Sequence, residues 1–347
     1  MNDWSIRQIA RIRFSLQFRS QKFKISMSIF MLFYQRNRLS LPIDISMFPM
    51  NMQGMINDFS KLDFDSLWKG REKVSRIEKS IILEFLGKKR LNNVLEVGCG
   101  EGRLQEELAE ISQKRFAVDL EPKFLEKVHS FDPRIVTVNS DLNSLPFRKG
   151  FFDAIVIVRV LNFLTDPYTS TSNLSLYLRS GGLLILSFYH YPSIAYVLDR
   201  LYPTSKTETS VSFRSKKPVK VRKSNFDEFF LRKSQIIKAA ESNGLKLTFT
   251  SITGLGDYVP FKILSIPAIR TLERITSLFG FPPHTFLRFQ SASTIKSVEN
   301  SGNPFICQVC ETSFARIPRE NETETCDQCG SKLVNVKGII SFKTGGN

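Results

Sequence analysis

A run of glycines at alternate positions is the first feature of this sequence that could do chemistry. Glu96 precedes Gly98, Gly100 and Gly102 in the stretch VLEVGCGEGRL. Because glycine has no Cβ, the chain can pass close to a ligand here, and its backbone amides can approach it. A helix that opens directly after such a turn points its positive end at the same place. This pattern is typical of a loop that holds a nucleotide-like cofactor.

The elements that must position this loop are visible on both sides of it. Val94–Val97 predicts a buried strand that leads into the loop. A helix is expected from Gly70, in GREKVSRIEKSIILEFL, because apolar residues recur there at helical spacing: Val74, Ile77, Ile81, Ile82 and Phe85. Further strands are expected at 115–118, at 134–138, at 154–158 and in LRSGGLLILSFYH. In an open α/β sheet of this kind, ligands lie outside the carboxyl ends of the strands.

Acidic residues follow the second and third of these strands. Asp119 comes about 20 residues after the first glycine, where such sheets place a carboxylate on ribose hydroxyls. Asp141 and Leu142 follow the third strand, where Asp141 alternatively caps a turn. Glu96 alternatively braces the glycine loop by accepting backbone amides. The spacing E-x-G-x-G-x-G differs from the G-x-G-x-x-G of dinucleotide-binding folds, which argues against a pyrophosphate site.

Taken in order, these motifs resemble those of the class I S-adenosylmethionine (SAM) dependent methyltransferases, of the methyltransferase domain 11-like kind. The resemblance runs from roughly Gly70 to Leu247 and implies a Rossmann-like α/β fold with a doubly wound, mostly parallel, seven-stranded sheet. By this resemblance Asp119 binds the SAM ribose, Leu120 covers one face of the adenine, and Asp141 lies near the adenine amino group. The residues that it implies for SAM binding are Glu96, Gly98, Gly100, Gly102, Asp119, Leu120, Asp141, Leu142 and Arg159.

The methyl acceptor is expected at the loops after the fourth and fifth strands. Many small-molecule relatives carry a histidine in the loop after strand four, but this chain has Phe163, so that base cannot be carried over. His190, after strand five, is the best-placed candidate for a general base, with a structural, hydrogen-bonded role as the alternative. The D/N-P-P-Y signature of adenine-N6 methyltransferases is missing, which disfavours exocyclic-amine methylation of that type.

Four of the five cysteines form two C-x-x-C pairs near the C-terminus, separated by fifteen residues: Cys307, Cys310, Cys326 and Cys329. Two such knuckles complete a tetrahedral shell for Zn²⁺, and the spacing matches a zinc ribbon. A closed four-thiolate site serves folding rather than catalysis. Disulfides or a redox pair are the alternative, disfavoured because no secretory signal accompanies them. Cys99, inside the glycine loop, is expected to be a small core residue.

The net charge of +16 is concentrated in two segments. Residues 1–46 carry eight basic and two acidic side chains, and residues 204–238 carry ten and three. We therefore expect a poorly ordered basic N-terminal extension (1–46), a methyltransferase domain (47–300) and a zinc ribbon (301–347). Within the domain, the insert RSKKPVKVRK, Arg214–Lys223, would attract phosphates, or is a solvated loop. No segment reaches about 18 uninterrupted apolar residues, so a cytoplasmic protein without stable membrane insertion is expected.

Three functions remain open at this level. The first is a SAM-dependent methyltransferase (EC 2.1.1.-) acting on an O, N or C nucleophile of a small-molecule or lipid-like acceptor, which Arg214 and Arg222 could hold through a carboxylate or phosphate. The second is a tRNA or rRNA methyltransferase that uses the basic insert and the ribbon. The third is a non-catalytic SAM-fold scaffold whose ribbon binds a partner protein. The intact glycines, Asp119 and Asp141 argue against the third.

Overall fold

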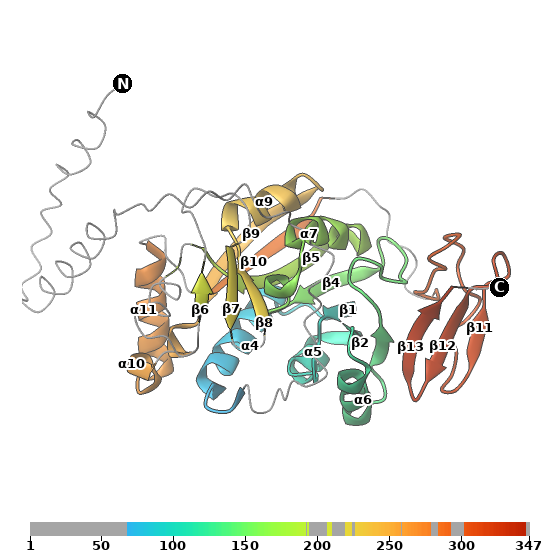
Figure 1. Cartoon of the computed structure of the whole chain (residues 1–347), viewed down its shortest axis with the longest axis horizontal. Coiled ribbons are helices and arrows are strands. Elements are labelled where there is room, and N and C mark those ends of the chain that lie inside the picture. The colour runs from blue at the N-terminus through green and yellow to red at the C-terminus, as the bar shows by residue number, and fades with distance from the viewer. Residues whose placement is uncertain are drawn as a thin grey trace, which may run out of the picture. The chain divides into compact units, whose positions relative to one another are not determined.

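A ten-stranded sheet forms the centre of the unit Gly54–Asn347 in the computed structural model of the chain (Figure 1). The structure describes residues 68–191, 193, 207–209, 219–223, 226–257, 259–278, 284–292 and 302–344. The basic extension expected at 1–46 lies outside these residues, as do Arg214–Pro218 of the insert.

The strand order defines the fold class. In chain order the strands of this sheet are β1 (Leu91–Val97), β2 (Ser112–Asp119), β3 (Val136–Asn139), β4 (Phe152–Ile157), β5 (Leu178–Tyr189), β9 (Leu245–Thr253), β10 (His284–Ser291), β11 (Thr323–Thr325), β12 (Lys332–Val336) and β13 (Ile339–Lys343). Across the sheet they run β11-β12-β13-β3-β2-β1-β4-β5-β10-β9. The expected mostly parallel sheet, β3-β2-β1-β4-β5-β10-β9, is confirmed, with β10 antiparallel to both neighbours. The parallel pairing of β13 with β3, which joins the C-terminal strands to this sheet, was not predicted.

Apolar residues on both faces of the central strands explain why helices cover the sheet on two sides. β1 and β4 are buried along almost their whole length, as expected of strands with helices above and below. The helices are α4 (Glu72–Leu86), α5 (Gln105–Ile111), α6 (Pro122–Phe131), α7 (Pro167–Leu174), α9 (Lys233–Glu241), α10 (Val259–Lys262) and α11 (Ile266–Leu278), with 3-10 turns η2 (Leu161–Phe163), η3 (Ser175–Tyr177) and η4 (Leu255–Asp257). Figure 1 shows α7 and α9 on one side of the sheet and α4, α5 and α6 on the other.

The helix predicted from Gly70 is confirmed as α4, and the apolar residues at helical spacing form its buried face. Val74, Ile77, Ile81, Ile82 and Phe85 are all buried. One member of the stripe is charged, since Glu78 is also fully buried. This charge belongs to the site described below.

The basic insert departs from the expected loop in the part that the structure describes. Val219–Lys223 forms strand β7, which pairs antiparallel with β6 (Thr207–Thr209) and with β8 (Phe226–Phe230). β7 alternates valine with lysine or arginine, as VKVRK, a period that suits a strand with one polar face. Among the helices that the structure describes, none has the length and apolar character needed to cross a membrane.

Candidate active site and metal centre

The chain reverses direction across the sheet between β1 and β4, and the glycine loop lies at this point, where parallel sheets bind ligands. Gly98, Gly100 and Gly102 all have positive φ angles, of 66°, 52° and 84°. A Cβ on Gly98 would lie 2.3 Å from Cγ2 of Val160, in the loop after β4. Only glycine fits at position 98, and its absence of a side chain brings the two loops into contact.

Most backbone amides of the glycine loop are already engaged within the protein. Gly98 N and Cys99 N both donate to the Val118 carbonyl, at 2.8 and 3.1 Å, and Gly102 N donates to the Cys99 carbonyl at 3.0 Å. Gly100 N donates to a carboxylate oxygen of Asp119 at 2.8 Å. The glycines therefore serve chiefly to keep the loop close to β2 and free of side chains, rather than to present these amides to a ligand.

Asp119, at the end of β2, holds two backbone amides. One carboxylate oxygen accepts from Gly100 N and the other from Glu121 N, at 3.0 Å. Burial raises the pKa of Asp119, against the effect of these amides. The neighbouring Leu120 is 58% exposed, although it is a large apolar side chain. An apolar side chain is therefore exposed beside the braced carboxylate, and the contacts of both residues with SAM stay a prediction.

The two residues predicted after β3 lie in different surroundings. Asp141 is exposed, and its side chain accepts a hydrogen bond from Asn143 N at 2.7 Å, so it caps a turn. Leu142 is buried in the main core, where its side chain packs with those of β3 and β4. The Leu142 side chain therefore belongs to the core, whereas Asp141 lies at the surface.

Glu96 is buried below the glycine loop. It accepts a hydrogen bond from the Gln105 side-chain amide at 2.6 Å and is 4% exposed. Burial raises the pKa of Glu96 to about 8, and the Gln105 hydrogen bond and the charge of Arg103 only partly offset this effect. In the free protein Glu96 is therefore protonated at neutral pH.

This pKa predicts how the Glu96→Gln variant responds to pH. Between pH 4.5 and about 8 the folded chain keeps a proton that the unfolded chain has lost, so the contribution of Glu96 to stability falls as pH rises and is constant above 8. The free energy of unfolding of Glu96→Gln should therefore rise relative to the wild type by roughly 1 kcal/mol per pH unit across this window. Urea denaturation of both proteins at pH 5, 6.5 and 8 measures the difference. A difference that does not change with pH would contradict a protonated Glu96.

A cluster of charged and aromatic side chains lies next to the glycine loop, and we call it the Glu78 cluster: Trp68, Glu78, Arg103, Arg159, Tyr189 and His284. Glu78 accepts hydrogen bonds from Arg103 and Arg159, each at 2.8 Å. Burial opposes its ionisation, but Arg159 and Arg103 outweigh this and hold the pKa of Glu78 well below its usual value. Both guanidinium groups lie over the Trp68 ring, at 4.0 Å for Arg103 and 5.3 Å for Arg159.

Three elements at the carboxyl edge of the sheet contribute the rest of the cluster. Arg159 follows β4 with a φ of 61°, a conformation that costs a residue with a side chain on the order of 1–3 kcal/mol. Its guanidinium donates to the Tyr189 hydroxyl at 2.7 Å. His284, the first residue of β10, pairs with Tyr189 across the strands, and its Nδ1 lies 3.5 Å from Glu78. A strained, doubly held arginine beside the glycine loop indicates a functional position.

Of this cluster, Arg159 was predicted from the sequence as a SAM-binding residue, and Tyr189 lies at the end of strand five, where the acceptor was expected. A detectable signal existed for Glu78, because it occupies the apolar stripe of α4, between Ile77 and Ile81. Arg103 directly follows the last glycine of the loop. His284 had no such signal, since its place at the site depends on the antiparallel pairing of β10 with β5.

His190 lies next to this cluster along the chain but faces elsewhere. It is 9% exposed, its backbone bridges to Leu231, and its ring lies 6.4 Å from that of Phe188. Successive side chains of a strand point to opposite faces. Because Tyr189 points into the Glu78 cluster, His190 points toward the opposite face of β5.

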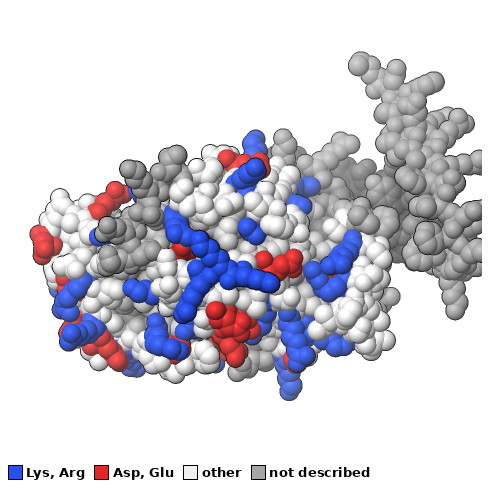
Figure 2. Space-filling model, turned by 180° about the vertical axis from the view of Figure 1, so that it is seen from behind, with Lys and Arg blue, Asp and Glu red and all other residues white. Residues whose placement is uncertain are grey.

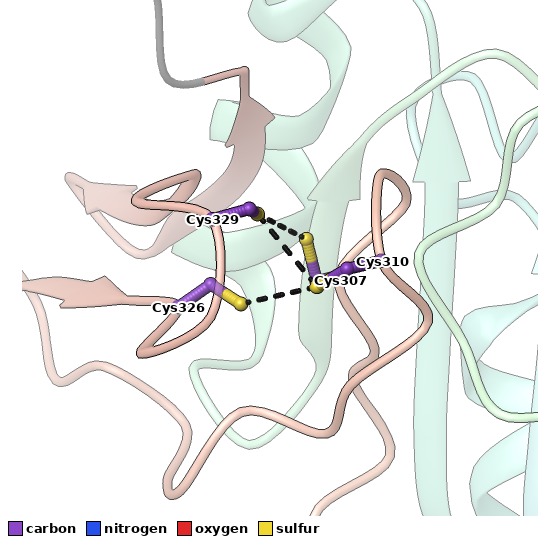
Figure 3. Close-up of side chains that lie close together, drawn as sticks. All are labelled: Cys307, Cys310, Cys326 and Cys329. Atoms are coloured by element: carbon purple, nitrogen blue, oxygen red, sulfur yellow. Dashed lines mark hydrogen bonds between the residues drawn. The ribbon is translucent and has the colours of Figure 1, made fainter.

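The four C-terminal cysteines converge from two loops, as the C-x-x-C spacing predicted (Figure 3). Their sulfur atoms all lie within 4.8 Å of one another, with distances of 3.4 Å for Cys307–Cys329 and Cys310–Cys326. All are free thiols, so no disulfide joins them. A tetrahedral ion with Zn–S bonds of about 2.3 Å places its sulfurs about 3.8 Å apart. The donor set and its dimensions fit Zn²⁺.

Comparison with known proteins agrees with this geometry. Residues 95–186 match the family model described as methyltransferase domain. A probable SAM-dependent methyltransferase of Mycobacterium tuberculosis is 28% identical over 126 residues, which cover 36% of this chain and 44% of that protein. A ubiquinone biosynthesis O-methyltransferase of Xanthomonas campestris is 30% identical over 110 residues, covering 30% of this chain and 46% of that protein. The chain thus spans less than half the length of these relatives.

This chain is also similar to a solved structure. The N-methyltransferase NodS of Bradyrhizobium japonicum, in complex with S-adenosyl-L-homocysteine, is 16% identical, with a TM-score of 0.41 over 63% of this chain and 87% of that one. The family match, the strand order and the glycine loop agree that residues 95–186 belong to a methyltransferase domain with a Rossmann-like fold.

Proposed function

We propose that the chain transfers a methyl group from SAM to an O, N or C nucleophile of a small-molecule or lipid-like acceptor that carries an anionic group. The observation that carries this proposal is the contact between the two halves of the site. Gly98 packs against Val160, the neighbour of Arg159, and Arg103 follows Gly102. A donor bound at the glycine loop is therefore adjacent to the Glu78 cluster.

The donor half is assigned to the loops after β1, β2 and β3. In this proposal Asp119 binds the ribose hydroxyls, Leu120 covers the adenine and Asp141 lies near the adenine amino group. The sulfonium end then lies over the glycine loop, toward Arg159. The assigned residues are Glu96, Gly98, Gly100, Gly102, Asp119, Leu120, Asp141, Leu142 and Arg159. The exposure of Leu120 and the bracing of Asp119 support this assignment.

The acceptor half is assigned to the edge formed by β4, β5 and β10. Two arginines face a single carboxylate in the Glu78 cluster, so the cluster carries an excess of positive charge beside the glycine loop. Such an excess favours a carboxylate or phosphate on the acceptor. The site's main task is to align the nucleophile with the methyl group, since proximity and orientation supply about 7–11 kcal/mol. The small-molecule O-methyltransferases among the relatives support this acceptor class.

Labelled methyl transfer tests the proposal. Purified full-length protein and methyl-labelled SAM are added to cell extract, and the label is sorted into small molecules, RNA and protein. We expect label in an anionic small-molecule or lipid fraction. Absence of SAM binding by the purified protein would exclude a methyltransferase. Label confined to RNA would show that the acceptor is RNA and not a small molecule.

An RNA acceptor is the second candidate, because residues 204–238 carry ten basic and three acidic side chains. Binding to RNA would weaken steeply with salt and on neutralising Lys216, Lys217, Lys220 and Arg222. Figure 2 shows a band of Lys and Arg side chains near the middle of one face, with Asp and Glu beside it. Because charges of both signs lie side by side, this face does not form a continuous basic surface for a long phosphate backbone.

His190 stays the predicted general base for an acceptor whose nucleophile reaches the face of β5 opposite the Glu78 cluster. If it accepts the proton of the nucleophile, His190→Ala should lower kcat by about 100-fold or more without changing SAM affinity. Steady-state kinetics and SAM titration of the same preparations measure both quantities. Unchanged kcat would exclude His190 as the general base. It would favour a base within the Glu78 cluster, from which the His190 side chain points away.

We assign Zn²⁺ to the four cysteines as a structural ion. Four thiolates complete its coordination shell, so the ion contributes folding free energy and takes no part in methyl transfer. The sulfur distances given above support this assignment.

A further inference from the structure

The C-terminal strands join the methyltransferase sheet at the edge next to the donor site. β13 pairs parallel with β3, with Ile339, Ile340 and Ser341 opposite Thr137, Val138 and Asn139. The fully buried Thr137 hydroxyl also donates to the Gly338 carbonyl, at 2.8 Å. Without β13, β3 would be an edge strand with unpaired backbone groups.

The first cysteine knuckle contacts the loop that connects β3 to β4. Arg148 N donates to the Pro304 carbonyl at 2.8 Å, and Ile306 N donates to the Pro146 carbonyl at 3.0 Å. Between these bonds, the buried rings of Phe147 and Phe305 lie 5.3 Å apart. The segment that leads into Cys307 is therefore paired with the loop as a short piece of antiparallel sheet.

One side chain of the knuckle reaches the turn that carries Asp141. The Gln308 side-chain amide donates to the Ser144 carbonyl, which also accepts from the Ser140 hydroxyl at 2.7 Å. Ser144 N in turn donates to the Asp141 carbonyl at 3.0 Å. The turn Ser140–Ser144 is closed by its own bonds and is tied to the knuckle by Gln308.

The position of Gln308 depends on the cysteine centre, because it lies between two of its ligands. Thiolates brought this close repel one another unless a cation compensates their charge. Loss of the ion would let the two knuckles separate, and the 304–308 segment would lose the geometry that holds the loop.

From these contacts we propose that the ribbon is a metal-dependent clamp on residues Ser140–Arg148, and that Zn²⁺ at the four cysteines strengthens SAM binding through this loop. The SAM part of this inference rests on the proposed function, and specifically on Asp141 lying at the adenine. The clamp itself rests only on the contacts between the ribbon and the loop. Gln308 acts as a positioning residue, since it reaches the site through Ser144.

SAM titration of the full-length chain tests the coupling. We expect removal of Zn²⁺ by a chelator to raise the Kd for SAM by about 5- to 150-fold, the usual range of coupling between sites, and zinc addition to restore it. Coupling is reciprocal, so saturating SAM should raise the affinity for Zn²⁺ by the same factor. Equal SAM affinity with and without zinc would overturn the coupling.

Two glutamine variants distinguish the clamp from general loss of structure. Gln308→Ala should bind one equivalent of zinc but raise the Kd for SAM by about 3- to 10-fold, the worth of one hydrogen bond. Gln328→Ala is the matched control, because Gln328 occupies the second knuckle and accepts from the Thr312 hydroxyl within the ribbon. The proposal is wrong if the two variants bind SAM equally well.

Hydrogen exchange gives a readout that does not need SAM. On zinc removal, amides of 141–148 should exchange faster, while those of β1 and β4 remain protected. If zinc-loaded protein failed to bind SAM, the proposed function would fail, but this measurement would still decide the clamp. Unchanged exchange at 141–148 would overturn it.

Discussion

Replacing Asp119 with alanine is expected to weaken SAM binding by at least about 100-fold. In the proposed function this carboxylate accepts hydrogen bonds from both ribose hydroxyls, and bonds to a charged group contribute about 1.5–3 kcal/mol each. The substitution also removes the partner of Gly100 N, so the glycine loop loses one of its ties to β2. Donor contacts and loop geometry are therefore lost together. Isothermal titration with SAM measures the loss.

Two further variants separate these contributions. Asp119→Asn keeps a side-chain oxygen for one amide but loses the charge, so its SAM affinity should lie between those of the wild type and the alanine variant. Asp166→Ala is the matched control: Asp166 also accepts a backbone amide, from Thr169 at 3.0 Å, but it caps α7. It should cost about 1 kcal/mol of stability and leave SAM affinity unchanged. Wild-type affinity in Asp119→Ala would exclude Asp119 from the donor site.

The methyltransferase sheet and the loops that follow its strands could be predicted from the sequence because their signals are local. Alternate glycines, a buried strand before them and acids after the next strands depend on neighbours within a few residues. The amphipathic stripe of α4 is of the same kind. Each of these patterns follows from the backbone geometry of one element, so no knowledge of distant contacts is needed.

The Glu78 cluster could not be predicted from such local patterns. Its members come from α4 and the turn before it, from the loops after β1 and β4, and from β5 and β10, so their convergence depends on the strand order β1-β4-β5-β10. His284 reaches the site only because β10 runs antiparallel to β5, which places its first residue beside the last residue of β5. Glu78 could have been identified, since a buried carboxylate in an apolar stripe needs cationic partners. The spacing of charges along the chain does not say which arginines they are.

The pairing of the C-terminal strands with the methyltransferase sheet was not predicted, for a related reason. The cysteine spacing predicts a ribbon by itself, and nothing in Ile339–Lys343 distinguishes an outer strand from one that pairs with β3. The burial of Ile340 and Phe305 in the main core decides the question. The ribbon and the methyltransferase sheet therefore share one core. Loss of a metal ligand is expected to destabilise both.

Replacing Cys307 with serine is accordingly expected to have the largest effect on stability of any single change at the metal centre. Cys307 is fully buried in the main core, and its loss removes one of four ligands while burying a hydroxyl group. Structural zinc supplies on the order of 10 kcal/mol to a small domain. We expect zinc content to fall below one equivalent and residues 302–344 to lose protection from exchange.

Cys99→Ser is the control for this change, because Cys99 is also buried but lies in the glycine loop, outside the cysteine centre. It should retain one equivalent of zinc and a protected ribbon. Elemental analysis and hydrogen exchange measure both proteins. Since β13 completes the edge of β3, exchange in Cys307→Ser should also accelerate in Val136–Asn139, whereas an independent ribbon would unfold and leave β3 protected. One equivalent of zinc in Cys307→Ser, with wild-type stability, would refute a four-cysteine site.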